Sequence, residues 1–97
     1  MIITQLEGTV PADQWDTLKQ AFEKAAHQLP SAIEHSYLIQ DQDSTDTWRV
    51  LTVWKSWEAL QDYRATVETP GGVLMFRAAG AEPSLSIGDV VEHAHQD

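Results

Sequence analysis

The sequence of 97 residues contains 15 acidic and 6 basic residues, which gives a formal net charge of −9, and it contains no cysteine. A field of this sign repels phosphate backbones and anionic lipid surfaces, which argues against nucleic-acid and membrane-surface functions. The lack of cysteine removes disulfides, thiolate metal sites and cysteine nucleophiles. A chain of this length forms one domain, which we expect at residues 1–92, followed by a polar tail at residues 93–97.

The longest apolar runs fall far short of the ~20 residues that a membrane-spanning helix needs. The first five residues lack the basic start and small-residue cleavage site of a secretory signal. From these two observations we expect a cytoplasmic protein.

The first quarter of the chain predicts a strand and then a helix. Residues 2–7 are rich in β-branched side chains and are followed by Gly8, which is typical of a short strand. Pro11 suits the first turn of a helix, and Pro30 ends one. Between the two prolines the apolar residues recur at helical spacing and form one stripe: Trp15, Leu18, Phe22, Ala25, Ala26 and Leu29.

The middle of the chain predicts a β-hairpin. Residues 32–41 alternate in character, and a period of two places four side chains on one face: Ile33, His35, Tyr37 and Ile39. The acidic cluster at residues 41–46 is typical of a turn, and residues 47–54 predict the second strand. Because residues 50–54 are almost continuously apolar, we expect this strand to be covered on both sides.

The last part predicts a helix, a short helix and a strand. Ser56 is a good N-cap, and helical spacing continues to Val67. Residues 73–79 predict a short helical segment that ends at Gly80, and residues 84–92 predict the final strand.

The predicted order is β-α-β-β-α-(short α)-β, which is typical of an α+β, ferredoxin-like subunit with a four-stranded antiparallel sheet. The helices cover one face of that sheet, and nothing in the chain covers the other. An exposed apolar face of several hundred Å² would forfeit on the order of 10 kcal/mol of burial. We therefore expect a homodimer that pairs through the sheet faces.

The segment from Val50 to Leu60 is a strand that ends in Trp54 and leads through a serine cap into a helix. This segment resembles the antibiotic biosynthesis monooxygenase superfamily, and the likeness extends over essentially the whole chain. The resemblance implies a dimeric α+β barrel. It does not imply one activity, because similar proteins include cofactor-free oxygenases of polyketide phenols, haem-degrading enzymes, quinol oxidases and domains without an assigned reaction.

The segment from Leu51 to Ser56 is very similar to the haem-degrading branch of that superfamily. That branch uses an Asn in the first strand, a Trp in the second helix and a His just beyond it. This chain contains no Asn, places Tyr63 near the position of that Trp, and has no His between Thr66 and Gly80. The sequence therefore argues against haem degradation.

The resemblance implies a ligand cavity between the sheet and the helices. The candidate catalytic residues are His35, as a general base, and Tyr63, whose hydroxyl needs a polar partner if buried. The candidate substrate-binding aromatics are Tyr37, Trp54, Trp57 and Phe76. The alternatives are that these aromatics form the core and that His35 is a hydrogen-bonded residue at the barrel rim.

Two functions follow from the sequence. The first is a cofactor-independent monooxygenase acting on a small aromatic or polyketide-like substrate, with neither cofactor nor metal. The second is a dimeric ligand-binding or accessory module without chemistry of its own. A cavity of ~300 Å³ or more with converging polar side chains would favour the enzyme.

Overall fold

The computed structural model describes residues 1–96 and has the predicted order of elements. In chain order these are β1 (Ile2–Thr9), the short 3-10 helix η1 (Ala12–Gln14), α1 (Trp15–Ala26), β2 (Ile33–Gln40), β3 (Thr47–Trp54), α2 (Trp57–Thr66), α3 (Gly71–Ala78) and β4 (Ser84–Asp89).

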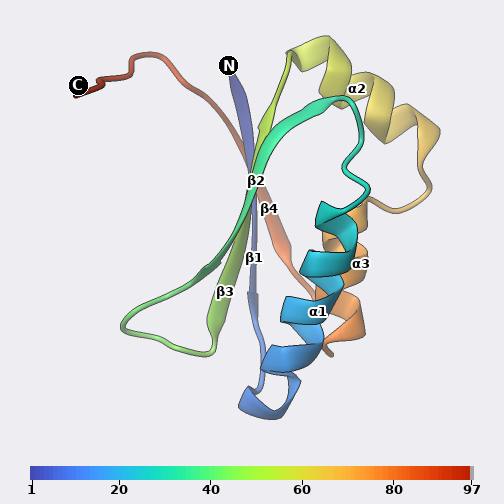
Figure 1. Cartoon of the computed structure of the whole chain (residues 1–97), viewed down its shortest axis with the longest axis vertical. Helices are drawn as coiled ribbons and strands as arrows, with labels where there is room; N and C mark the ends of the chain where they lie inside the picture. The colour runs from blue at the N-terminus through green and yellow to red at the C-terminus, as the bar shows by residue number, and fades with distance from the viewer. Residues whose placement is uncertain (97) are drawn as a thin grey trace.

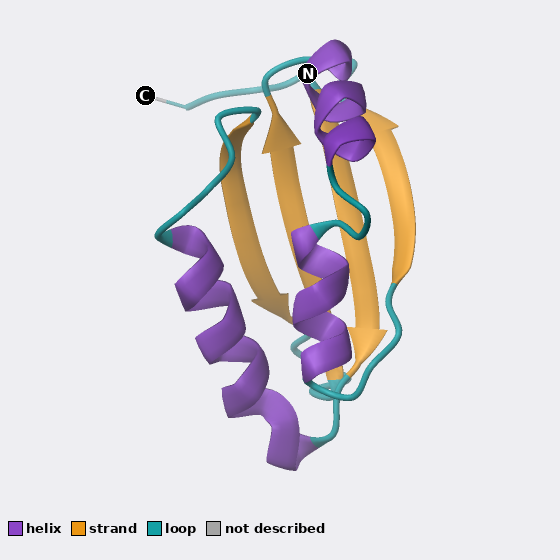
Figure 2. Cartoon of the chain, turned by 90° about the vertical axis from the view of Figure 1, so that its right-hand side faces the viewer, coloured by secondary structure: helices purple, strands orange, loops and turns teal. Residues whose placement is uncertain are grey.

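The four strands form one antiparallel sheet in the order β2-β3-β1-β4, so the predicted α+β, ferredoxin-like architecture is confirmed. All the helices lie on the same side of this sheet, and the other side carries none (Figure 1). Seen from the helical side, α1 and α3 lie side by side over one end of the sheet and α2 lies over the other end (Figure 2). Within residues 1–96, no helix has the length and apolar character needed to span a bilayer.

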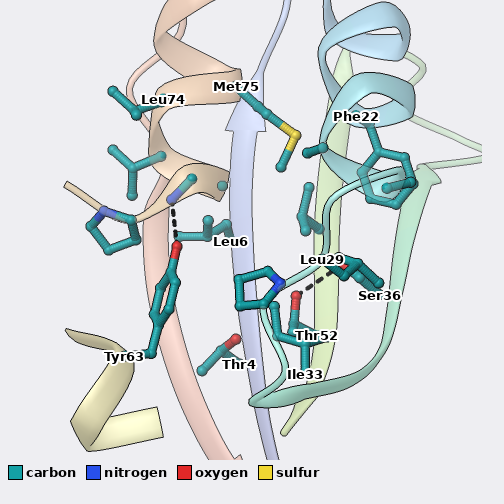
Figure 3. Close-up of a pocket in the computed structure, with 18 of the residues that line it drawn as sticks. Thr4, Leu6, Phe22, Leu29, Ile33, Ser36, Thr52, Tyr63, Leu74 and Met75 are labelled. Carbon is teal, nitrogen blue, oxygen red and sulfur yellow. Dashed lines mark hydrogen bonds between the residues drawn. The ribbon is translucent and has the colours of Figure 1, made fainter. Parts of the chain in front are cut away.

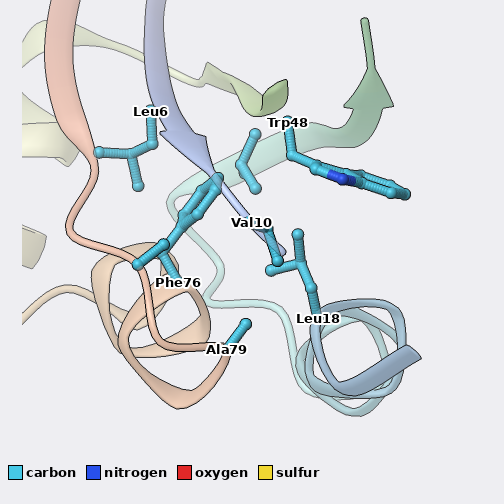
Figure 4. Packing of buried hydrophobic residues seen from close by; sticks show 8 residues of the cluster. Leu6, Val10, Leu18, Trp48, Phe76 and Ala79 are labelled. Carbon is cyan, nitrogen blue, oxygen red and sulfur yellow. The ribbon is translucent and has the colours of Figure 1, made fainter. Parts of the chain in front are cut away.

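The hydrophobic core lies beneath α1 and α3, at one end of the layer between helices and sheet (Figure 4). Phe76 from α3 and Leu18 from α1 are fully buried there. A Cβ atom on Gly8 would lie 2.9 Å from Cδ1 of the Phe76 ring. Gly8 therefore makes room for this ring within β1, and the strand continues two residues beyond the predicted end at Glu7.

The ends of the helices differ in how well the sequence predicts them. The Ser56 cap is confirmed, because its Oγ accepts a hydrogen bond of 3.0 Å from the backbone N–H of Ala59. The first helix begins with a 3-10 turn and ends at Ala26, three residues before the end of its apolar stripe. The segment that follows Ala26 is not helical, and it places Leu29 and Pro30 beside the cavity described below.

A β-bulge in β2 corrects the predicted face of this strand. Ile33 pairs with Trp54, and His35 pairs with the next residue along β3, Val53, so that Glu34 is the extra residue. A bulge of this kind reverses the side on which the residues before it point. Ile33 therefore points to the helical side, whereas His35 and the alternate residues after it point to the helix-free side.

The helix-free face of the sheet carries apolar residues that are partly exposed. Tyr37 and Ile39 from β2 are 50% and 37% exposed, and Leu51 on β3 is half-buried. Val53 is buried even without a covering element. The predicted burial of β3 thus holds for its helical side, and on the other side three of its four residues are half-buried.

An ion-pair network connects β1, β3 and the hairpin turn on the same face. Arg49 donates through Nε to Glu7 at 2.7 Å and through Nη1 to Asp41 at 2.9 Å. The other carboxylate oxygen of Asp41 accepts from the backbone N–H groups of Ser44 and Asp43. These bonds, the one from Ser44 first and that from Arg49 next, hold the pKa of Asp41 below its usual value.

This lowered pKa predicts how the stability of the hairpin changes with pH. A carboxyl whose pKa is lower in the folded state contributes stability above its unfolded pKa, about 3.9, and loses it as the pH falls through the folded value. Asp41→Asn keeps an oxygen for the turn but loses the charge beside Arg49. We expect this variant to have a lower urea midpoint than the wild type near pH 7, and we expect the difference to shrink as the pH falls below about 3.9.

Asp43→Asn is the matched control, because within residues 1–96 the Asp43 side chain makes no hydrogen bond and only its backbone N–H contributes. Equal midpoints for the Asp41 variant and the wild type at neutral pH would show that the charge of Asp41 adds no stability.

Candidate functional site

A cavity of about 530 Å³ occupies the end of the helix–sheet layer that the core leaves open. Its walls are the end of α1, the segment that follows it, α2 and the start of α3, and its floor is the helical side of the sheet. Most lining side chains are apolar, including Leu6, Phe22, Leu29, Leu74 and Met75 (Figure 3). This volume lies within the range of small-molecule sites.

Two aromatic side chains form one wall of the cavity. The rings of Trp54 and Tyr63 lie 5.2 Å apart between centroids at an interplanar angle of 48°. Trp54 donates through Nε1 to Oγ1 of Thr4 at 2.9 Å, which fixes the indole against the floor. The Tyr63 hydroxyl accepts a bond of 3.0 Å from the backbone N–H of Gly71 (Figure 3). Tyr63 thus connects α2 to the first residue of α3.

The structure brings together two of the predicted site residues, Trp54 and Tyr63, and corrects the positions expected for His35 and Tyr37. Because Ser36 points into the cavity, its two neighbours point to the helix-free side. There the His35 and Tyr37 rings stack with centroids 6.3 Å apart. The sheet therefore separates His35 from Tyr63, and His35 is not placed to act as a base in this cavity.

The remaining two aromatics also lie away from the cavity. Trp57 begins α2, is 44% exposed and does not line the cavity. Phe76 is fully buried in the core, as the alternative interpretation held. Its helix faces the cavity only through residues near its start and through Ala78.

Three cavity residues were missed by the sequence analysis: Thr4, Ser36 and Thr52. All three carry hydroxyls and point to the helical side of the sheet. The next residues on the same side of β1 and β3 are apolar, namely Leu6 and Val50. Thr52 could have been noticed, because it is the one polar residue in the apolar run of residues 50–54. The grouping of all three depends on the register of three strands, which the sequence does not supply.

The charged side chains that line the cavity are both basic. Lys24 at the end of α1 and Arg64 on α2 are exposed, and neither forms an ion pair within residues 1–96. Asp, Glu and His are absent from the lining in the described part of the chain. The charges on the cavity lining are thus positive in a protein whose formal net charge is −9.

Comparison with known proteins establishes the fold. No protein-family model matches the sequence, and no curated protein matches it either. Solved structures do match over nearly the whole chain. A candidate antibiotic biosynthesis monooxygenase from Deinococcus radiodurans is 12% identical with a TM-score of 0.74, over 100% of this chain and 99% of that one.

Two further solved structures share this fold. SnoaB, a cofactor-independent oxygenase from Streptomyces nogalater, is 14% identical with a TM-score of 0.70, over 98% of this chain and 97% of that one. A variant of MhuD with two manganese protoporphyrins in each active site is 19% identical with a TM-score of 0.70, over 99% and 100%. The chain thus has the fold of the antibiotic biosynthesis monooxygenases, as its resemblance implied, and at these identities the likeness concerns the fold.

Proposed function

We propose that this protein is a cofactor-independent monooxygenase of the antibiotic biosynthesis monooxygenase type, which oxidises a small aromatic or polyketide-like substrate in the cavity between sheet and helices. The observation that carries the proposal is the cavity itself. It has about 530 Å³ of space, an apolar lining and the aromatic pair Trp54 and Tyr63. A flat aromatic molecule would stack well on such a wall.

In this reaction the substrate supplies the electrons. An activated ring carbon that carries two hydrogens loses both, forms a double bond to one atom of O2 and releases the other atom as water. Loss of the first proton gives an electron-rich anion, and that anion reduces O2. The apolar walls would shield this anion from water. The Tyr63 hydroxyl would donate a hydrogen bond to the substrate, because its bond from Gly71 uses it only as an acceptor.

Oxygen uptake by the purified protein with a panel of anthrone-type and quinol compounds tests the proposal. Tyr63→Phe keeps the ring and removes the hydroxyl, so we expect kcat/KM to fall by about 10²-fold. Tyr37→Phe is the matched control, because it removes the same group from the opposite face of the sheet. We expect its turnover to equal that of the wild type.

Absence of oxygen uptake with every compound, in a protein that still binds them, would favour the non-catalytic ligand-binding module instead. Equal turnover in Tyr63→Phe and Tyr37→Phe would remove the role proposed for Tyr63. Melting curves of both variants are needed, because Tyr63→Phe also removes the acceptor for the Gly71 N–H.

We further propose that the protein acts as a homodimer paired through the helix-free faces of two sheets. The half-exposed apolar residues Tyr37, Ile39 and Leu51 support this pairing, since a second copy would remove them from water. The cavity lies on the other side of the sheet and would stay accessible in such a dimer.

A further inference from the structure

Three hydroxyl groups form a row across the floor of the cavity. Ser36 on β2 lies opposite Thr52 on β3, and Thr52 lies opposite Thr4 on β1. The Ser36 and Thr52 oxygens are 3.1 Å apart, and both threonines are buried, with exposed fractions of 8% for Thr4 and 7% for Thr52. Figure 3 shows these side chains next to one another, with Tyr63 beyond Thr4. We call Thr4, Ser36 and Thr52 the hydroxyl row.

The hydroxyl row holds more hydrogen-bond donors than it uses. Thr4 accepts from Trp54, so its own hydrogen is not spent in that bond. Ser36 and Thr52 share one hydrogen between two oxygens, which leaves the other hydrogen unused. Within residues 1–96 no acceptor takes these two hydrogens. Both hydrogens are therefore available to an occupant of the cavity that brings an acceptor.

Charge selects among the acceptors. The only charges on the described cavity lining are those of Lys24 and Arg64, and the lining contains no carboxylate to repel an anion. Hydrogen bonds to a charged acceptor are about twice as strong as those between neutral groups. An oxyanion therefore gains more from the hydroxyl row than a neutral hydroxyl of the same ligand, which would also have to place its own hydrogen.

We infer that the hydroxyl row is an oxyanion subsite, which binds an aromatic ligand in its deprotonated, phenolate or enolate, form. The inference rests on the proposed function for the aromatic nature of the ligand. No Asp, Glu or His of the described chain lines the cavity, so the proton of the ligand passes to solvent rather than to a carboxylate or imidazole of the site. The subsite thus selects the form of the ligand that donates electrons most readily.

A nitrophenol tests this inference, because its phenol and phenolate forms absorb at different wavelengths. The probe is titrated with pH in the presence of saturating protein and in buffer alone. If the site binds the phenolate about tenfold more tightly than the phenol, the titration midpoint of the bound probe falls by about one pH unit. We expect this fall in the wild type.

The double variant Ser36→Ala, Thr52→Val removes both partners of one hydrogen bond and strands neither, so it should keep the fold. We expect the shift to shrink by at least half in this variant and to persist in Thr52→Ser, which keeps the hydroxyl. Thr9→Val is the matched control, because Thr9 is exposed at the end of β1 and does not line the cavity.

An unshifted or raised midpoint in the wild type would overturn the inference without any variant, as would a probe that does not bind. A shift that survives in the folded double variant would also overturn it. The readout needs no turnover, so a lowered midpoint without oxygen uptake would leave the subsite standing and refute the oxygenase.

Discussion

Replacement of Phe76 by alanine is expected to lower the free energy of unfolding by about 3–5 kcal/mol, the usual cost of emptying a buried phenylalanine site. The ring is fully buried between α3 and β1, in contact with the space that Gly8 leaves open. For a domain of this size each kcal/mol lowers the melting temperature by about 4–8 °C, so the variant should melt more than about 10 °C below the wild type. Thermal unfolding followed by circular dichroism measures the effect.

Leu74→Ala is the matched control on the same helix. Leu74 is 53% exposed at the cavity, so its truncation removes little buried area. We expect a much smaller loss of stability in this control. A loss for Phe76→Ala no greater than that for Leu74→Ala would contradict the position of Phe76 in the core.

Replacement of Leu51 by glutamate is expected to convert the proposed dimer into a monomer. Leu51 lies on β3, a central strand of the sheet, and points to the helix-free side. Its neighbours in the sheet are Tyr37 on β2 and Gln5 on β1. A carboxylate buried between two sheet faces costs several kcal/mol, and each ~1.4 kcal/mol weakens dimerisation tenfold. The dissociation constant should therefore rise by at least about 10²-fold, and light scattering at micromolar concentration should report a mass of 10.8 kDa.

Gln20→Glu adds the same charge at an exposed position of α1, on the helical side, and should leave the dimer intact. A wild-type protein that is monomeric under these conditions would contradict the dimer itself. A Leu51→Glu protein that remains dimeric would show that the subunits pair through another surface.

Local chemistry explains how much of the fold the sequence predicts. The Ser56 cap follows from a side chain that bonds a backbone group three residues away, and the stripe on the first helix follows from spacing along one element. The order of strands follows from the order of elements, because few topologies accommodate it. These features need no knowledge of distant contacts.

The candidate site depends on distant contacts, and sequence prediction was weaker there. Glu34 is an extra residue in β2, so Ile33 points into the cavity whereas His35 and Tyr37 point to the face away from it. An alternating pattern looks the same with or without that bulge. Likewise, the row of Thr4, Ser36 and Thr52 exists only because three strands are in register.

The alternation along β3 places two surfaces on one backbone. Thr52 faces the cavity, and its neighbour Val53 faces the side on which we propose that a second subunit packs. A movement of β3 that accompanies ligand binding in the cavity would therefore also move the residues of β3 at the proposed dimer interface. If the ligand tightens the dimer by some factor, the dimer tightens ligand binding by that same factor, since the coupling free energy is shared. Ligand affinity would then depend on protein concentration.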